Sequence, residues 1–183
     1  MTNNKYLIAL IIFQANRPAI EKVQEEISWR AALPPPFKKL PPHVTAFRPI
    51  GLASSEERAL IAIIKKIAAA IPSFSATITG PLDNFGKKYV VRRLPLTPEL
   101  SMMQAALIEQ LPSLAGFEFE LYDKENTFHI TYAENLHKIF DEVWENIKCI
   151  EVEDMKLYFN AFSLYRKEPG GEYKHMEIFP FQG

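Results

Sequence analysis

Residues 128–132 read Phe-His-Ile-Thr-Tyr, and residues 42–46, far upstream, read Pro-His-Val-Thr-Ala. Each stretch is a short apolar run that contains the pattern His-aliphatic-Thr, which is typical of a β-strand. Successive side chains of a strand point to opposite faces, so the His and the Thr of each stretch share one face and the aliphatic residue between them packs inward. The sequence therefore predicts two strands that each present one imidazole and one hydroxyl.

This pattern occurs more often in the chain than its composition predicts. The chain has four His in 183 residues. Two of them followed by Thr two positions later are expected in about one of a hundred sequences of this composition. The alternative for either motif alone is a hydrogen-bonded strand histidine without a function. Two copies favour a paired site over that alternative.

The composition limits the class of protein. With 183 residues, 48% of them hydrophobic, and no linker rich in Gly or Ser, we expect a single two-lobed domain over residues 1–183. The net charge of −1 argues against a protein that binds nucleic acid over its whole surface. Cys149 is the only cysteine, which excludes an intrachain disulfide and fits a reducing, cytoplasmic compartment; we expect it to be buried on a helix. The apolar run 6–13 is too short to span a bilayer and predicts a buried strand.

The rest of the chain alternates between helical and strand patterns. Helices are expected over residues 18–32, 54–70, 98–111 and 136–147, and strands over 74–94 (two or three, the last from 88), 117–121, 155–165 and 176–181. Ser54 and Glu57 have the spacing of a capping box, and Thr97 is placed as an N-cap. The last two strands are expected to form a long hairpin around residues 169–171. Each half of the chain has a helix, a His-aliphatic-Thr strand, a helix and further strands, so the two motifs occupy matching places in two lobes.

Two imidazoles across a cleft suit acid–base chemistry on a phosphate diester. The ordinary pKa of imidazole is about 6.5, so one ring can be neutral while the other is protonated. One ring can then deprotonate the attacking oxygen and the other can protonate the leaving oxygen, and each transfer contributes about 10²–10⁴-fold. The Thr hydroxyls are short neutral donors to the non-bridging phosphoryl oxygens. Because no Asp, Glu or Cys stands at ligand spacing from these His, we expect no metal and no cofactor.

The paired motifs, the chain length and the order of elements resemble the two-histidine (2H) phosphoesterase superfamily, which includes the 2′-5′ RNA ligases and the cyclic nucleotide phosphodiesterases. The resemblance extends from Tyr6 to Phe181. It includes residues 164–166 (Leu-Tyr-Arg) and 171–173 (Gly-Glu-Tyr), which are similar to the family's C-terminal strands. It implies an α+β fold, in which a single bilobal domain with a pseudo-two-fold duplication has antiparallel sheets lining a central cleft and helices on the outside.

The resemblance also implies an activity. The protein would be a metal-independent phosphodiesterase or a 2′-5′ RNA ligase that acts on 2′,3′-cyclic or 2′-5′ phosphodiesters of nucleotides or RNA. The catalytic residues would be His43 and His129, with Thr45 and Thr131 binding the substrate phosphate. In the cyclic phosphodiesterase members the His of the first motif is the acid, so His43 would protonate the leaving oxygen and His129 would activate water; this polarity differs among members. The partner implied is a nucleotide or an RNA end, neither DNA nor a membrane, and we expect a monomer.

Two positions depart from the pattern of the RNA-ligase-like members. Those members usually have a basic residue after the second motif, where this chain has Glu134, and Leu after the first Thr, where this chain has Ala46. The chain therefore looks closer to the uncharacterised bacterial members of the family.

Three further residues are candidates for substrate contacts. Phe47 continues the face of His43 and Thr45, where its ring either stacks on a base or packs at the floor of the cleft. Arg92 and Arg93 supply positive charge for a phosphate. The alternative function is a binding module that holds a nucleotide or RNA phosphate in the same cleft without turnover. The two retained His favour the enzyme, because a binder needs donors but no general base.

Overall fold

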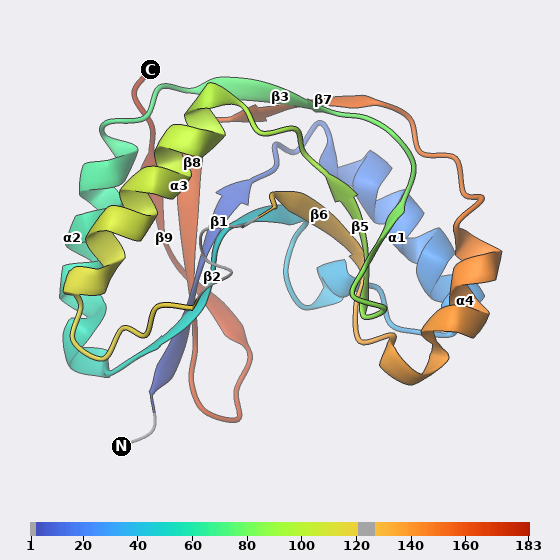
Figure 1. The fold of residues 1–183 in the computed structure, drawn as a ribbon, viewed down its shortest axis with the longest axis horizontal. Coiled ribbons are helices and arrows are strands. Elements are labelled where there is room, and N and C mark those ends of the chain that lie inside the picture. The colour runs from blue at the N-terminus through green and yellow to red at the C-terminus, as the bar shows by residue number, and fades with distance from the viewer. Residues whose placement is uncertain (1–2, 121–126) are drawn as a thin grey trace.

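The structure is a computed structural model that describes residues 3–120 and 127–183, and it confirms the α+β class (Figure 1). The strands are β1 (Asn4–Ile11), β2 (His43–Leu52), β3 (Phe74–Ile78), β4 (Asp83–Phe85), β5 (Tyr89–Arg93), β6 (His129–Ala133), β7 (Met155–Phe159), β8 (Ala161–Lys167) and β9 (Tyr173–Pro180). The α-helices are α1 (Arg17–Ala31), α2 (Glu57–Ala68), α3 (Pro98–Gln110) and α4 (Phe140–Ile147). The described residues also form the 3-10 turns η1 (Pro36–Lys38), η2 (Ser54–Glu56), η3 (Leu111–Ser113) and η5 (His137–Ile139).

One antiparallel sheet runs through the molecule in the strand order β4-β5-β6-β2-β1-β8-β9. The two motif strands, β2 and β6, are neighbours at its centre, and their pairing joins Val44 to Ile130. Both of these side chains are fully buried. The aliphatic residue of each motif therefore faces the core, as the period of two predicted, and the His and Thr face the other way.

The centre of the sheet divides the molecule into two lobes. We call β1, β2, β8 and β9, with α2 and α3, the β2 lobe, and β4, β5 and β6, with α1 and α4, the β6 lobe. Helix α1 packs on β6 and α4, whereas α3 packs on β2 and α2. Figure 1 shows the two helix pairs at opposite sides of the molecule.

The order of elements repeats once along the chain. The series β1-α1-β2-α2-β3 is followed by the equivalent series β5-α3-β6-α4-β7. In each series the helix between the first two strands packs on the lobe that does not contain those strands. The strands β3 and β7 carry the chain from one lobe to the other, and they pair with each other as a separate two-stranded ribbon. The motif strands therefore stand at equivalent places of a pseudo-two-fold arrangement.

The helices begin and bury their faces for simple reasons. Pro18 lies in the first turn of α1, where its missing N–H has no partner to lose, and Ile20, Ile27 and Ala31 form the buried stripe of this helix. The hydroxyl of Thr97 accepts a hydrogen bond from the Leu100 N–H at 3.3 Å, so the predicted N-cap of α3 is present.

Three local predictions were wrong. The capping box at Ser54 and Glu57 is not formed: α2 begins one turn later, at Glu57, and the Ser54 hydroxyl instead accepts a hydrogen bond from the Asn4 amide at 3.1 Å. Residues 117–120 are not a strand, since they pair with none of the described strands; the last residue of that prediction, Leu121, lies outside the described residues. Cys149 is exposed, because α4 ends at Ile147 and the cysteine lies beyond its buried stripe.

The expected final hairpin is present in part. The predicted strand 155–165 is interrupted at Asn160, so β7 pairs with β3 while β8 pairs with β1 and β9. The hairpin therefore consists of β8 and β9 alone.

Candidate active site

The two motifs lie side by side at the centre of the sheet. His43 opens β2 and His129 opens β6, and these antiparallel strands pair through the aliphatic residue of each motif. This register sets His43 opposite Thr131 and Thr45 opposite His129. Directly opposite residues have Cβ atoms about 4.5–5.5 Å apart, and diagonal ones are about 7–8 Å apart. The two imidazoles are thus diagonal neighbours on one face, and a hydroxyl occupies each of the other two corners.

A backbone carbonyl two residues earlier anchors each imidazole in the same way. His43 Nδ1 lies 2.8 Å from the carbonyl oxygen of Pro41, and His129 Nδ1 lies 2.7 Å from that of Thr127. A carbonyl can only accept a hydrogen bond, so Nδ1 is the donor in both rings. Each neutral imidazole therefore holds its lone pair on Nε2, which has no hydrogen-bond partner among the described residues.

Burial lowers the pKa of His43 below its ordinary value. The carbonyl of Pro41 opposes this effect, the nearby His129 adds to it, and the carboxylate of Glu134 opposes it. Burial likewise lowers the pKa of His129, against the hydrogen bond to its own carbonyl partner, and the positive charge of Arg93 lowers it further. The two rings thus differ in their charged neighbours: a carboxylate stands near His43 and a guanidinium near His129.

Both rings open into one cleft of about 920 Å³. Pockets for small organic ligands span about 300–1,000 Å³, so the cleft is at the large end of that range. Its lining contains the two His and two Thr of the motifs, four prolines, and Leu7, Gln24, Lys39, Leu40, Arg48, Phe85, Tyr89, Arg93, Thr127, Glu134, Asn135, Lys167 and Tyr173. The hydroxyls of Thr45 and Thr131 have no hydrogen-bond partner in the described part of the chain, so both are available to a ligand.

A β-bulge decides between the two alternatives for Phe47. In the pairing of β1 with β2, Ile8 lies opposite Phe47 and Ala9 lies opposite Thr45, so two residues of β2 match one of β1. The extra residue shifts the alternation, and Phe47 turns into the core with 2% of its surface exposed. Phe47 therefore cannot stack on a base in the cleft.

Arg48 takes the cleft-facing position instead. It lines the cleft, donates a hydrogen bond to the carbonyl of Glu118 and forms an ion pair with Glu120 at 3.1 Å. The sequence reasoning did not identify Arg48. The usual alternation of a strand gives no sign of a bulge.

Of the two arginines of β5, only Arg93 lines the cleft. Arg93 pairs in register with His129, whereas Arg92 pairs with Ile130 and so faces the opposite side. Arg92 is fully buried, and it donates hydrogen bonds to the carbonyls of Gly80 and Glu153 at 3.0 and 2.9 Å. Its role is to hold loops together, and the expectation that it contacts substrate is corrected.

Two further groups support the site. The amide of Gln24 in α1 donates a hydrogen bond to the Thr131 carbonyl at 2.8 Å and so holds β6 against α1. Lys39 lies in the proline-rich loop between α1 and β2 (residues 33–42) and forms an ion pair with Glu134 across the lining of the cleft.

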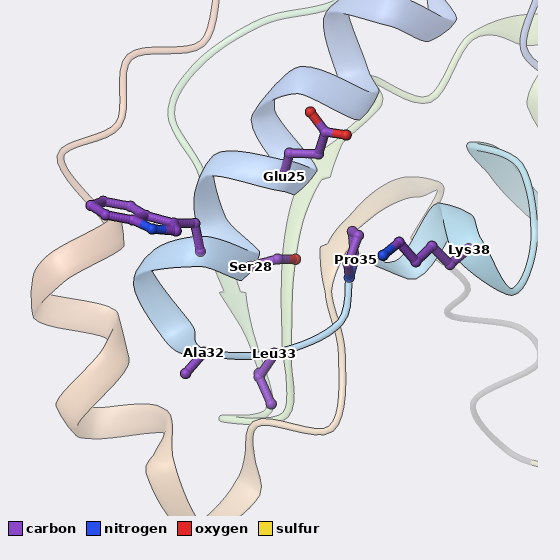
Figure 2. Close-up of a pocket in the computed structure, with 7 residues that line it drawn as sticks. Glu25, Ser28, Ala32, Leu33, Pro35 and Lys38 are labelled. Carbon is purple, nitrogen blue, oxygen red and sulfur yellow. The ribbon is translucent and has the colours of Figure 1, made fainter.

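A second hollow lies between the end of α1 and the proline-rich loop (Figure 2). Its lining includes Glu25, Ser28, Leu33 and Lys38, which belong to neither motif. None of the predicted site residues lines it.

Comparison with known sequences identifies the family. A sequence profile of the 2′-5′ RNA ligase superfamily matches residues 14–170. The chain belongs to the 2′-5′ RNA ligase superfamily. The match spans both motifs of this superfamily member. No curated protein sequence matches it significantly.

Solved structures of low sequence identity share the fold of this superfamily member. TT0787 of Thermus thermophilus is 19% identical, with a TM-score of 0.63 and coverage of 98% of both chains. E. coli LigT complexed with phosphate is 17% identical, with a TM-score of 0.59 over 100% of both chains. Kluyveromyces marxianus Usb1 is 12% identical, with a TM-score of 0.56 over 98% of this chain and 99% of the other.

Within residues 3–120 and 127–183, no three His, Cys, Asp or Glu side chains lie close enough together to hold a metal ion. In that same part of the chain, none of the helices combines the length and the apolar character needed to cross a membrane.

Proposed function

We propose that this protein is a metal-independent phosphodiesterase, or a 2′-5′ RNA ligase that uses the same chemistry, acting on 2′,3′-cyclic or 2′-5′ phosphodiesters of nucleotides or RNA. The observation that carries this proposal is the arrangement of His43 and His129. Both rings are anchored through Nδ1 and present Nε2 to one cleft, so both have the atom needed for proton transfer directed at a shared ligand.

In the hydrolytic direction, His129 Nε2 takes a proton from water while the water oxygen bonds to phosphorus. The bond from phosphorus to the leaving oxygen breaks, and that oxygen takes a proton from His43 Nε2. The neighbouring charges support this polarity, because Arg93 disfavours a protonated His129 and Glu134 favours a protonated His43. Exchange of protons with solvent then restores both rings.

The threonines complete the proposed mechanism. The hydroxyls of Thr45 and Thr131 donate to the non-bridging oxygens, which carry the negative charge that grows in the transition state. E. coli LigT, a protein of this fold, has been solved in complex with phosphate and in complex with 3′-AMP, which supports phosphate binding as a property that this fold can carry. By analogy, we place the scissile phosphate of this protein between the two motifs.

The test is an assay of 2′,3′-cyclic nucleotides and 2′-5′-linked oligonucleotides in the presence of EDTA. We expect turnover that chelation does not reduce. Activity that disappears in EDTA and returns with a divalent metal would contradict the metal-independent mechanism. Tight binding of these ligands by the wild-type protein without any turnover would indicate a binding module instead.

A further inference from the structure

Gln24 is a polar residue in the apolar stripe of α1. It is 2% exposed and lies between Ile20 and Ile27, two core residues of the same helix. A buried amide costs free energy unless its donors and acceptor have partners. Gln24 is also part of the lining of the cleft that holds both motifs. A polar side chain at such a place points to a role beyond packing.

The carbonyl that Gln24 contacts points away from β5. The Leu94 N–H, at the end of β5, donates a hydrogen bond to the Phe128 carbonyl at 2.8 Å. The hydrogen-bonding groups of successive residues alternate between the two sides of an antiparallel strand. Phe128 therefore bonds toward β5, and Thr131, three residues later, directs its carbonyl to the other side, toward β2.

The ladder between β2 and β6 ends at this carbonyl. Among the described residues, the pairing of the two strands consists of Val44 and Ile130. The strand β2 begins one residue before Val44, and the two residues before it are prolines, which have no N–H to donate. The Nε2 of Gln24 donates to the Thr131 carbonyl at 2.8 Å. A side chain of α1 thus bonds to β6 at the point where the contact with β2 stops.

The other end of the carboxamide is unsatisfied. A carbonyl only accepts hydrogen bonds, so Nε2 is the atom that faces Thr131 and Oε1 points elsewhere. Oε1 is buried and has no hydrogen-bond partner among the described residues. A methionine, which has a similar length and shape, would avoid the cost of this buried acceptor. Stability alone therefore does not explain a glutamine at this position.

The hydrogen bond from Gln24 acts on the residue that bears a phosphate-binding hydroxyl. The carbonyl and the side chain of Thr131 leave the same Cα, so fixing the carbonyl also restrains the direction of the hydroxyl. Thr131 stands opposite His43, at the end of a pairing that is one residue pair long. Displacement of a group by about 1 Å in a catalytic site can cost about 10²-fold in rate.

We propose that Gln24 is a positioning residue for the reaction. It holds Thr131 beside His43, so that the Thr131 hydroxyl reaches the non-bridging oxygens of the phosphate. This inference rests on the proposed function and adds to it a residue that lies outside both motifs. Gln24 acts through Thr131 and does not itself touch the substrate.

The first test is Gln24→Met, assayed on a substrate that the protein cleaves. We expect kcat to fall by about 10- to 100-fold with KM near wild type, because the hydroxyl acts on charge that grows in the transition state. The Tm should stay close to wild type, since the variant loses one hydrogen bond but also removes the unsatisfied acceptor. Ser28→Ala is the matched control: Ser28 is a buried polar residue one turn further along α1, lines the second hollow instead of the cleft, and should leave kcat unchanged. A lower Tm with unchanged kcat would show that Gln24 is only structural and would overturn the inference.

A double-mutant cycle identifies the group through which Gln24 acts. In a Thr131→Val background, Gln24→Met should have little further effect on kcat, because the hydroxyl that it positions is absent. In a Thr45→Val background, the same change should keep its effect. Equal effects of Gln24→Met in both backgrounds would overturn the inference.

Failure of the proposed function is a separate result. If the wild-type protein cleaves none of the substrates, the catalytic proposal falls, and the same cycle is measured as the Kd of 3′-AMP by calorimetry. The phosphate of 3′-AMP carries close to two negative charges at pH 7, as a phosphodiester does in an addition-type transition state, so its binding depends on the same hydroxyls. Weaker binding by Gln24→Met that persists with Thr45→Val and disappears with Thr131→Val would support the positioning role. An unchanged Kd, or no binding of 3′-AMP by the wild-type protein, would overturn it.

Discussion

At the scale of single residues, the carbonyls of Pro41 and Thr127 decide which nitrogen of each imidazole faces the cleft. Each carbonyl holds the proton of a neutral ring on Nδ1 and leaves Nε2 to exchange a proton with a ligand. The same hydrogen bond restrains the orientation of the ring. Two backbone oxygens thus supply what a carboxylate supplies in many histidine-based sites.

Removal of either ring should abolish most of the activity. On a cleaved substrate, we expect His43→Ala and His129→Ala each to lower kcat/KM by about 10²–10⁴-fold. The double variant should be little worse than either single variant, because acid and base act as a unit. His175→Ala is the control, since His175 is exposed and lies outside the cleft. A His129→Ala variant with nearly wild-type kcat/KM would contradict the two-histidine mechanism.

The pH dependence of kcat/KM should reflect the charged residues that lie near the two imidazoles. The active form has one protonated and one neutral imidazole, and both pKa values are lowered. The maximum of kcat/KM is therefore expected below about pH 6.5, the ordinary imidazole pKa. Glu134→Gln removes a charge that raises the pKa of His43 and should move the bell-shaped profile to lower pH. Arg93→Gln removes a charge that lowers the pKa of His129 and should move it to higher pH. Shifts in the reverse directions would show that these groups do not act on the rings.

At the scale of the elements, most of the prediction of the site was based on the alternation of side chains between the two faces of a strand. It correctly assigned His43 and Thr45 to one face of β2, and the same rule explains why only one of two adjacent arginines can reach the cleft. The rule failed one step later, at Phe47, because a bulge changes the phase of the strand and depends on the pairing partner rather than on the residues themselves. The alternating run 117–120 failed for a related reason: a strand needs a neighbour, and the sequence does not show which edges are free. The pairing of β3 with β7 was equally hidden, since it joins segments far apart in the chain.

The N-cap of α3 gives a prediction about stability. Thr97→Ala leaves the Leu100 N–H without its side-chain acceptor. We expect a loss of about 1 kcal/mol in the free energy of unfolding, which corresponds to a fall in Tm of about 2–4 °C for a domain of this size. Thr97→Ser keeps the hydroxyl and should stay close to wild type in the same thermal melt. Equal Tm values for the Ala and Ser variants would show that the cap contributes nothing.

At the scale of the whole molecule, the two lobes meet in the sheet where β2 pairs with β6, and we call this junction the seam. The strands β2 and β6 pair there through Val44 and Ile130, both fully buried, and the imidazoles of His43 and His129 lie on either side of this pair. The separation of the rings is therefore set by the packing of the core beneath the seam.

Charge at this seam should unfold the protein. Val44→Asp buries a carboxylate without a partner, and we expect the cooperative thermal transition followed by circular dichroism to be lost. Val44→Ile keeps an apolar side chain but adds one methylene to a packed core, so it should cost about 1–3 kcal/mol and leave a cooperative transition. Leu96→Asp tests the effect of the charge alone, because Leu96 is 62% exposed, and its Tm should stay near that of wild type. A folded Val44→Asp protein would mean that the seam tolerates water.

The pairing of β1 with β8 has a consequence for the order in which the protein is made. The β2 lobe takes its first strands from the beginning of the chain and its last strands from the end. During synthesis, β1 leaves the ribosome with a nearly continuous apolar sequence, and one edge of it stays without a partner until β8 has been translated. Contacts so distant in sequence form slowly, and an unpaired apolar edge can pair with other chains in the meantime. A nascent chain that stalls just before residue 161 should therefore aggregate or engage chaperones, although both histidine motifs have already been translated.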